Sequence, residues 1–259
     1  MLAEDVHMPS DFVMVPGGFR ADLYTADQAR SLPPGGTNDL LIQIAAWCEN
    51  YVAQPSGLDG RAGSVCPFVP ESLVRGSLKV AVVPLKKRGE AAKPEIERTA
   101  AAFRDTFLAR EKGQGRIDIF GVWVMIFPDV TAEEAPAVID TTQRKLKPTF
   151  VKEGLMLGEF HPLGLTPGVR NPSFRPLRSP VPLLIVRHMV EADINFLTRP
   201  VDSASVRVQS LKAYLQFLGS SLSSASKTRA LDALQMAGAE VTQTQAAPLP
   251  GTDLRKHAF

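Results

Sequence analysis

Two histidines and one cysteine are the side chains best suited to chemistry in this sequence of 259 residues. His161 follows Glu159 at the end of a predicted strand and His188 ends another, so both imidazoles could transfer protons, and His161 could bind a metal. Cys66 precedes a short predicted helix, whose dipole, together with the nearby Arg61, favours the thiolate. A thiolate can ligate haem iron or attack an electrophile.

Each of these residues also has a purely structural interpretation. Cys66 can pack as a small apolar residue in a buried turn, which we favour because no base lies near it in the sequence. His161 can be a capping histidine beside an exposed Glu159, and His188 can be a satisfied core histidine. Because we expect adjacent strand ends to converge in a sheet, we predict that Cys66, His161 and His188 line one concave pocket.

A loop rich in proline and arginine separates the two histidines. Residues 169–182 contain four prolines and three arginines. Proline lowers the entropy cost of ordering a loop, so Arg170, Arg175 and Arg178 could present fixed forks to carboxylates or phosphates. Arg187 in the following strand could join them. The alternative is a solvated loop whose arginines pair with carboxylates of the same chain.

The composition describes an ordinary globular protein and disfavours several classes. Hydrophobic residues are 44% and charged residues 22%, and the net charge of +2 suggests neither nucleic acid nor a membrane surface as partner. No apolar run approaches the roughly 18 residues of a membrane span. The N-terminus lacks the features of an export signal, which predicts a cytoplasmic protein whose Cys48 and Cys66 are free thiols. Nucleotide phosphate loops and zinc motifs are absent from the sequence.

The elements that must position these residues follow from the spacing of apolar side chains. The apolar stripe after Thr37, which includes Trp47 and Tyr51, predicts an amphipathic helix of about 16 residues that buries Cys48. Strands are predicted at 77–85, 116–127, 154–160 and 182–188, and helices at 94–111, 131–152, 189–197 and 202–219. Thr131 and Glu134 fit a capping box at the start of the helix 131–152. This order predicts a two-layer α+β fold, with a mixed or antiparallel sheet and helices packed mainly on one face, because only two intervals have βαβ length.

Composition also predicts how the chain is divided. Residues 1–36 carry two proline–glycine turn signals and are expected to form an N-terminal arm. Residues 37–219 are expected to form a single domain. Residues 220–259 are rich in Ser, Ala, Thr and Gln, which predicts a weak helix at 223–237 and a disordered tail from about residue 245.

Four segments resemble an uncharacterised bacterial family, a domain of unknown function associated with specialised-metabolite gene clusters. They are RAGSVCPF at 61–68, LMLGEFHP at 155–162, RNPSFRPLRSPVPLLIVRHM at 170–189 and DINFL at 193–197. The resemblance covers about residues 37–219. The Cys-Pro-Phe turn and the later His-Pro are also similar to the YqcI/YcgG family, although the order around the cysteine differs. Some members of that family are haem-dependent N-oxygenating enzymes.

These resemblances imply a haem-binding enzyme of specialised metabolism that oxidises or rearranges a nitrogen-containing small molecule. His161, His188 or Cys66 would be the axial ligand, with His161 favoured, and the arginines of 170–187 would hold propionates or an anionic or zwitterionic substrate. Two alternatives stay open. One is a cofactor-free binding or scaffold protein whose arginine–proline loop grips an anionic ligand or a partner. The other is a cofactor-independent enzyme with Cys66 as nucleophile. A homo-oligomer is compatible with all three.

Overall fold

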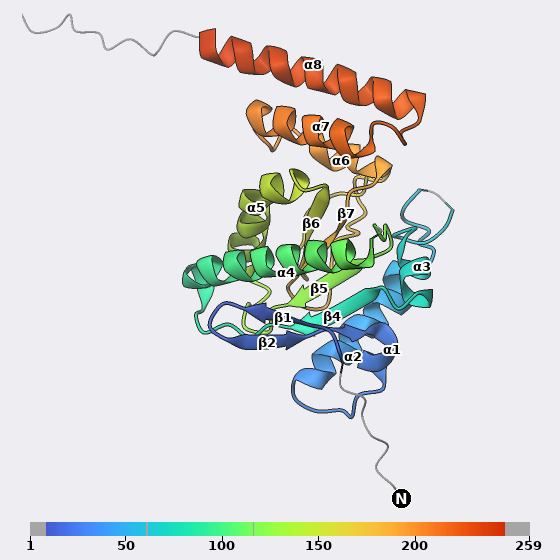
Figure 1. Cartoon of the computed structure of the whole chain (residues 1–259), viewed down its shortest axis with the longest axis vertical. Helices are drawn as coiled ribbons and strands as arrows, with labels where there is room; N and C mark the ends of the chain where they lie inside the picture. The colour runs from blue at the N-terminus through green and yellow to red at the C-terminus, as the bar shows by residue number, and fades with distance from the viewer. Residues whose placement is uncertain (1–8, 61, 116, 247–259) are drawn as a thin grey trace, which may run out of the picture. The chain divides into compact units, whose positions relative to one another are not determined.

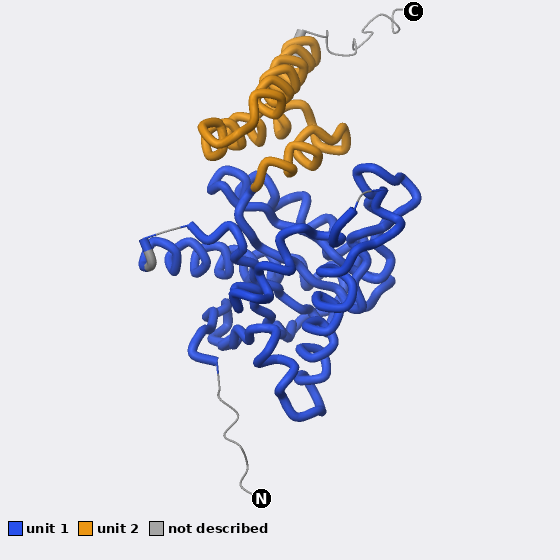
Figure 2. The backbone as a smooth tube through the Cα atoms, turned by 90° about the vertical axis from the view of Figure 1, so that its right-hand side faces the viewer, with its two compact units in different colours: residues 1–189 blue, residues 190–259 orange. Residues whose placement is uncertain are grey.

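The chain divides into two compact units, residues 1–189 and 190–259, which Figure 2 shows in different colours. The computed structural model describes residues 9–60, 62–115 and 117–246. The described part of the second unit is helical, and its elements are η4 (Glu191–Asp193), α6 (Ile194–Leu197), α7 (Ala204–Leu218) and α8 (Ser224–Ala246). The division falls at residue 189, whereas the sequence suggested one domain up to residue 219. Helix α8 extends past the expected 223–237 and includes residues 245 and 246, where the disordered tail was expected to begin. The rest of that predicted tail, residues 247–259, lies outside the described residues.

The first unit is built on a five-stranded mixed sheet with the strand order β3-β4-β5-β7-β6. The strands are β3 (Tyr24–Thr25), β4 (Leu78–Val82), β5 (Val122–Ile126), β6 (Leu155–Phe160) and β7 (Leu183–His188). β4 and β5 are parallel and are joined by the long helix α4 (Lys93–Gln114), while the other neighbours are antiparallel (Figure 1). The α+β class and the mixed sheet are therefore as predicted.

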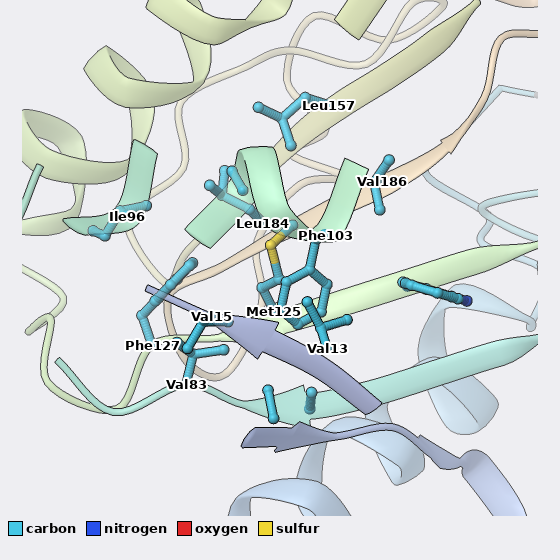
Figure 3. Packing of buried hydrophobic residues seen from close by; sticks show 14 of the residues in the cluster. Val13, Val15, Val83, Ile96, Phe103, Met125, Phe127, Leu157, Leu184 and Val186 are labelled. Carbon is cyan, nitrogen blue, oxygen red and sulfur yellow. The ribbon is translucent and has the colours of Figure 1, made fainter. Parts of the chain in front are cut away.

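Side chains that alternate along the central strands enter two separate cores. Phe103 of α4, Met125 of β5 and Leu184 of β7 meet in the first core (Figure 3). Ile44 and Val124 belong to the second. The first core is covered by β1 (Phe12–Val15), β2 (Phe19–Asp22), α4, the π-helix η3 (Pro136–Asp140) and α5 (Thr141–Val151). The second is covered by α1 (Ala26–Arg30), α2 (Thr37–Trp47), the π-helix η1 (Cys48–Val52) and α3 (Val69–Val74).

Helices consequently pack on both faces of the sheet, and the expectation of helices mainly on one face is corrected. The physical reason is visible in β5, where all five residues are buried. A strand that is apolar on both sides needs a cover on both sides, which is the usual situation of parallel strands between helices.

Residues 9–36 of the expected N-terminal arm are part of the fold. β1 and β2 form a hairpin whose Val13, Val15 and Ala21 are buried in the first core. Asp11 fastens this hairpin, because its carboxylate pairs with Lys79 and Arg110. The pKa of Asp11 is lowered: burial alone would raise it, but the hydrogen bonds and positive charges of Arg110 and Lys79 outweigh that effect.

Other predicted elements need smaller corrections. The expected helix after Thr37 is confirmed, because α2 and η1 run without a break from Thr37 to Val52. The capping box of Thr131 and Glu134 is also present, with reciprocal hydrogen bonds of 3.0 and 3.2 Å. The long strand expected at 116–127 is shortened to β5, because residues 118–121 form a turn closed by the Gly121 amide on the Asp118 carbonyl at 2.9 Å. Among the described residues, no helix has the length and apolar character to cross a membrane.

Candidate functional site

The two histidines lie at opposite ends of the sheet. β6 and β7 are antiparallel, with Phe160 beside Leu183 and Leu155 beside His188. His161 follows Phe160 and therefore lies at the end of the sheet where β7 begins with Leu183. His188 is the last residue of β7, five residues after Leu183, which corresponds to about 17 Å along the strand. The prediction that both imidazoles line one pocket is wrong, because only parallel neighbours bring their carboxyl ends together.

His161 pairs with Asp140 and not with Glu159. The His161 side chain is 2% exposed, and its Nε2 lies 3.0 Å from Oδ1 of Asp140 at the end of η3. Nδ1 of His161 is buried and has no hydrogen-bond partner in the described part of the chain. The Thr166 hydroxyl donates to Glu159 at 3.5 Å. No group of three or more potential metal ligands occurs among the described residues, so the metal role of His161 stays a prediction.

His188 forms a second buried pair, with Glu111 of α4. Nε2 of His188 and Oε1 of Glu111 are 2.5 Å apart, and the two side chains are 9% and 12% exposed. The ring of Phe107 lies 5.3 Å from the imidazole. Arg187 is at this same end of the sheet and donates from Nη1 to the His188 carbonyl at 2.8 Å. This arrangement fastens α4 to the sheet and supports the structural interpretation of His188.

The cysteines pack around η1. Cys66 is half-buried against the second core, and its amide donates to the Val52 carbonyl at 3.0 Å. Cys48 is buried, and both residues are free thiols. Burial, and secondly the neighbouring Cys66, raise the pKa of the Cys48 thiol to about 12. Arg61, which was expected to activate Cys66, lies outside the described residues.

An open pocket lies between the loop that joins β6 to β7 and the end of α2 with η1. Its volume is about 660 Å³, within the ordinary range of small-molecule sites. The lining residues are Trp47, Tyr51, Leu58, Pro162, Ser173, Phe174, Arg175, Arg178, Ser179 and Pro180. None of them is a carboxylate, and neither His161, His188 nor Cys66 is among them. A second groove, of about 530 Å³, lies along α4 and α5 and is lined by side chains of both charges.

One wall of the pocket is aromatic. Trp47 and Tyr51 are one helical turn apart, and their rings lie stacked with centroids 6.1 Å apart and planes inclined by 26°. Phe160 holds Trp47 from the sheet side in an edge contact at 5.8 Å. Burial, and secondly the carboxylate of Asp59, raise the pKa of Tyr51, so its hydroxyl remains protonated and able to donate.

Two arginines of the loop face the pocket in fixed orientations. Arg178 donates from Nε to the Gly164 carbonyl at 3.2 Å. Arg175 donates from Nη1 to the Phe174 carbonyl at 3.0 Å and to that of Pro172. No carboxylate of the described residues pairs with either guanidinium. For Arg175 and Arg178, the described residues therefore do not show the alternative in which the loop arginines pair with carboxylates of the same chain. Arg170 is exposed and does not line the pocket.

The helical half of this site escaped the sequence analysis. Trp47 and Tyr51 were assigned only to the apolar stripe of a helix, and Leu58 was not singled out. Two large aromatic residues one turn apart at the end of that stripe were the available signal. Residue type alone does not show whether an aromatic side chain lies in the core or in the wall of a pocket.

The family model described as a domain of unknown function (DUF6875) matches residues 41–229, a range that includes every residue of the pocket. This confirms the predicted likeness to a family of unknown function, and it shows no link to the YqcI/YcgG family. No curated protein and no solved structure shows significant similarity to the chain.

Proposed function

The chain belongs to the DUF6875 family, whose description names no activity, and we propose that it binds a small organic anion with an apolar body in the pocket beside the β6–β7 loop. One observation carries this proposal. Arg175 and Arg178 border a mainly apolar pocket, are anchored by backbone carbonyls and have no carboxylate partner among the described residues.

The anchoring leaves each guanidinium with one usable edge. The Nε–H group of Arg178 donates to the Gly164 carbonyl, so both terminal nitrogens of its guanidinium remain available. Nη1 of Arg175 donates to backbone carbonyls, so its Nε and Nη2 remain available to a ligand. Each remaining pair of nitrogens matches the two oxygens of a carboxylate. A group that is already held in place loses less entropy when it binds, which favours recognition of an anion here.

Binding has better support than nucleophilic catalysis. Cys66 is not among the residues that line the pocket, and His161 and His188 are each already paired with a carboxylate of the chain. Neither of the two pockets described above brings Cys66 together with a histidine, so the proposal of a Cys66 nucleophile with a histidine base has no support from the described residues.

We expect Arg178→Ala to weaken the binding of an organic anion by about 1.5–3 kcal/mol, or roughly 10- to 150-fold, because a charged hydrogen-bond donor is lost. The unliganded protein should melt at nearly the same temperature, since an exposed arginine contributes only about 0–1 kcal/mol to stability. Thermal melts with a panel of carboxylates and phosphates measure both effects. Arg170→Ala is the matched control, because Arg170 belongs to the same loop but does not line the pocket. A large fall in the melting temperature of unliganded Arg178→Ala would show a structural role instead.

Haem is the second candidate, because it is a flat apolar molecule with two carboxylates. Arg175 and Arg178 could hold the propionates, and Trp47 and Phe174 could contact the ring. His161 immediately precedes the pocket residue Pro162 and keeps one buried nitrogen without a partner, so it is the residue that would ligate the iron. Bound haem would supply redox chemistry at the pocket.

If haem binds, hemin added to the purified protein should produce an intense Soret band. His161→Ala should shift or abolish that band, because it removes the proposed ligand. His188→Ala should leave it unchanged, since His188 lies at the far end of the sheet. Absorption spectra of the three proteins decide the question. A protein that remains colourless after excess hemin is removed has taken up none, which would exclude haem and leave the binding of other anions unaffected.

A further inference from the structure

We propose that the anion bound in this pocket is an aryl carboxylate, whose ring lies against the Trp47–Tyr51 wall while its carboxylate meets Arg178 and Arg175. This inference rests on the proposed function, because it assigns a chemical class to the same ligand.

The aromatic wall formed by Trp47 and Tyr51 has a fixed geometry that suits contact with a flat ring. Trp47 is fixed from two sides, by Tyr51 in a stacked arrangement and by Phe160 in an edge contact. Both wall residues remain partly exposed and line the pocket, so they present ring surface to it. A ring of the ligand can extend this arrangement by offset stacking or by an edge contact, which a saturated ring of similar size does more weakly.

The polar groups around the wall are donors. The hydroxyl groups of Tyr51 and Ser173 accompany the two guanidinium groups, and no side-chain hydrogen bond of either hydroxyl occurs among the described residues. No carboxylate of the described residues lines the pocket, so a cationic head group would find no ion-pair partner among the lining residues. Donors at one side and rings at the other match a molecule with an acidic end and an aromatic body.

The chain itself supplies the reporter for a test. Trp47 and Trp123 are its two tryptophans, and Trp123 is 4% exposed in the first core, away from the pocket lining. In a Trp123→Phe variant, the tryptophan fluorescence comes from Trp47 alone. Should that variant fold poorly, the unmodified protein and Trp47→Phe give the same information by difference.

The experiment compares benzoate with cyclohexanecarboxylate and with the neutral benzamide, by calorimetric titration of the full chain and by Trp47 fluorescence. We expect benzoate to bind about 2- to 12-fold more tightly than the saturated acid, the range for one aromatic pair, and to change the Trp47 emission. Trp47→Leu should remove this preference. Arg178→Ala should weaken both acids by the same factor, and benzamide should bind far more weakly than benzoate.

Different failures have different meanings. Equal affinities for benzoate and cyclohexanecarboxylate, both reduced in Arg178→Ala, would overturn the aromatic assignment and leave anion binding in place. A Trp47→Leu variant that keeps the full preference for benzoate would also overturn it. If neither acid binds up to its solubility limit, or if both bind equally well to Arg178→Ala, both the inference and the proposed function fail.

Discussion

Replacing Glu111 by alanine should lower the free energy of unfolding of the first unit by about 3–5 kcal/mol. The replacement leaves the buried imidazole of His188 without its partner at 2.5 Å, and the Asp118 amide also loses a hydrogen bond of 3.3 Å to Oε1. Denaturation followed by tryptophan fluorescence reports on this unit specifically, because Trp47 and Trp123 both belong to it.

A matched control is available on the same helix. Glu97 of α4 pairs with the exposed Lys145 at 2.7 Å. Glu97→Ala should reduce stability by no more than about 1 kcal/mol, because a solvent-exposed ion pair contributes little. The double variant Glu111→Ala with His188→Ala should be less destabilised than the sum of the two single variants, since neither group is then left unpaired. If Glu111→Ala and Glu97→Ala have equal effects, the His188–Glu111 pair does not hold α4 to the sheet.

The stability of the protein should fall steeply as the pH rises from 9 to 12, and Cys48 should account for much of the fall. Its pKa rises from 9.0 to about 12 on folding, because burial, and secondly Cys66, disfavour the thiolate. Above pH 9 the unfolded chain releases this proton while the folded chain retains it. Ionisation therefore favours the unfolded state, by about 1.4 kcal/mol per pH unit and roughly 4 kcal/mol over the whole interval.

Tyrosines and lysines titrate in the same interval, so the effect of Cys48 is measured as a difference. Urea denaturation of the unmodified protein and of Cys48→Ala, in the presence of a phosphine reductant, gives the two pH profiles. We expect them to converge as the pH rises, because the variant lacks the titrating thiol. Cys66→Ala is the comparison: it removes the smaller cause of the Cys48 shift and keeps the burial, so we expect it to retain most of the fall in stability. Parallel profiles for Cys48→Ala and the unmodified protein between pH 9 and 11 would refute this explanation.

Periodicity was sufficient for the larger elements of the fold. Long helices such as α4 and strands such as β7 carry apolar residues at regular spacing, and their existence followed from the sequence. The β1–β2 hairpin was missed because a strand of four residues shows only two inward positions, Val13 and Val15 in β1. Such a short alternation does not stand out from a loop, and only the contact with α4 and the sheet explains why it is ordered.

The site was predictable in part. The concentration of arginine and proline in residues 169–182 marked one side of the pocket, because those residue types carry a local signal. The other side of the pocket depends on how β6 and β7 pair. The amino-acid types do not reveal whether two neighbouring strands are parallel or antiparallel. That single unknown separated His161 from His188 and brought Trp47 and Tyr51 to the β6–β7 loop instead.

The position of β7 has a consequence for the order in which the protein can fold during synthesis. β7 is the last strand of the sheet to leave the ribosome, yet it lies between β5 and β6, which are made earlier. Until residue 188 has emerged, β5 is an apolar strand with one unpaired edge, and β6 has no neighbour at all. Unpaired strand edges of this kind promote association between chains. The nascent chain must therefore keep the β5 edge from pairing with other molecules while some sixty residues are added.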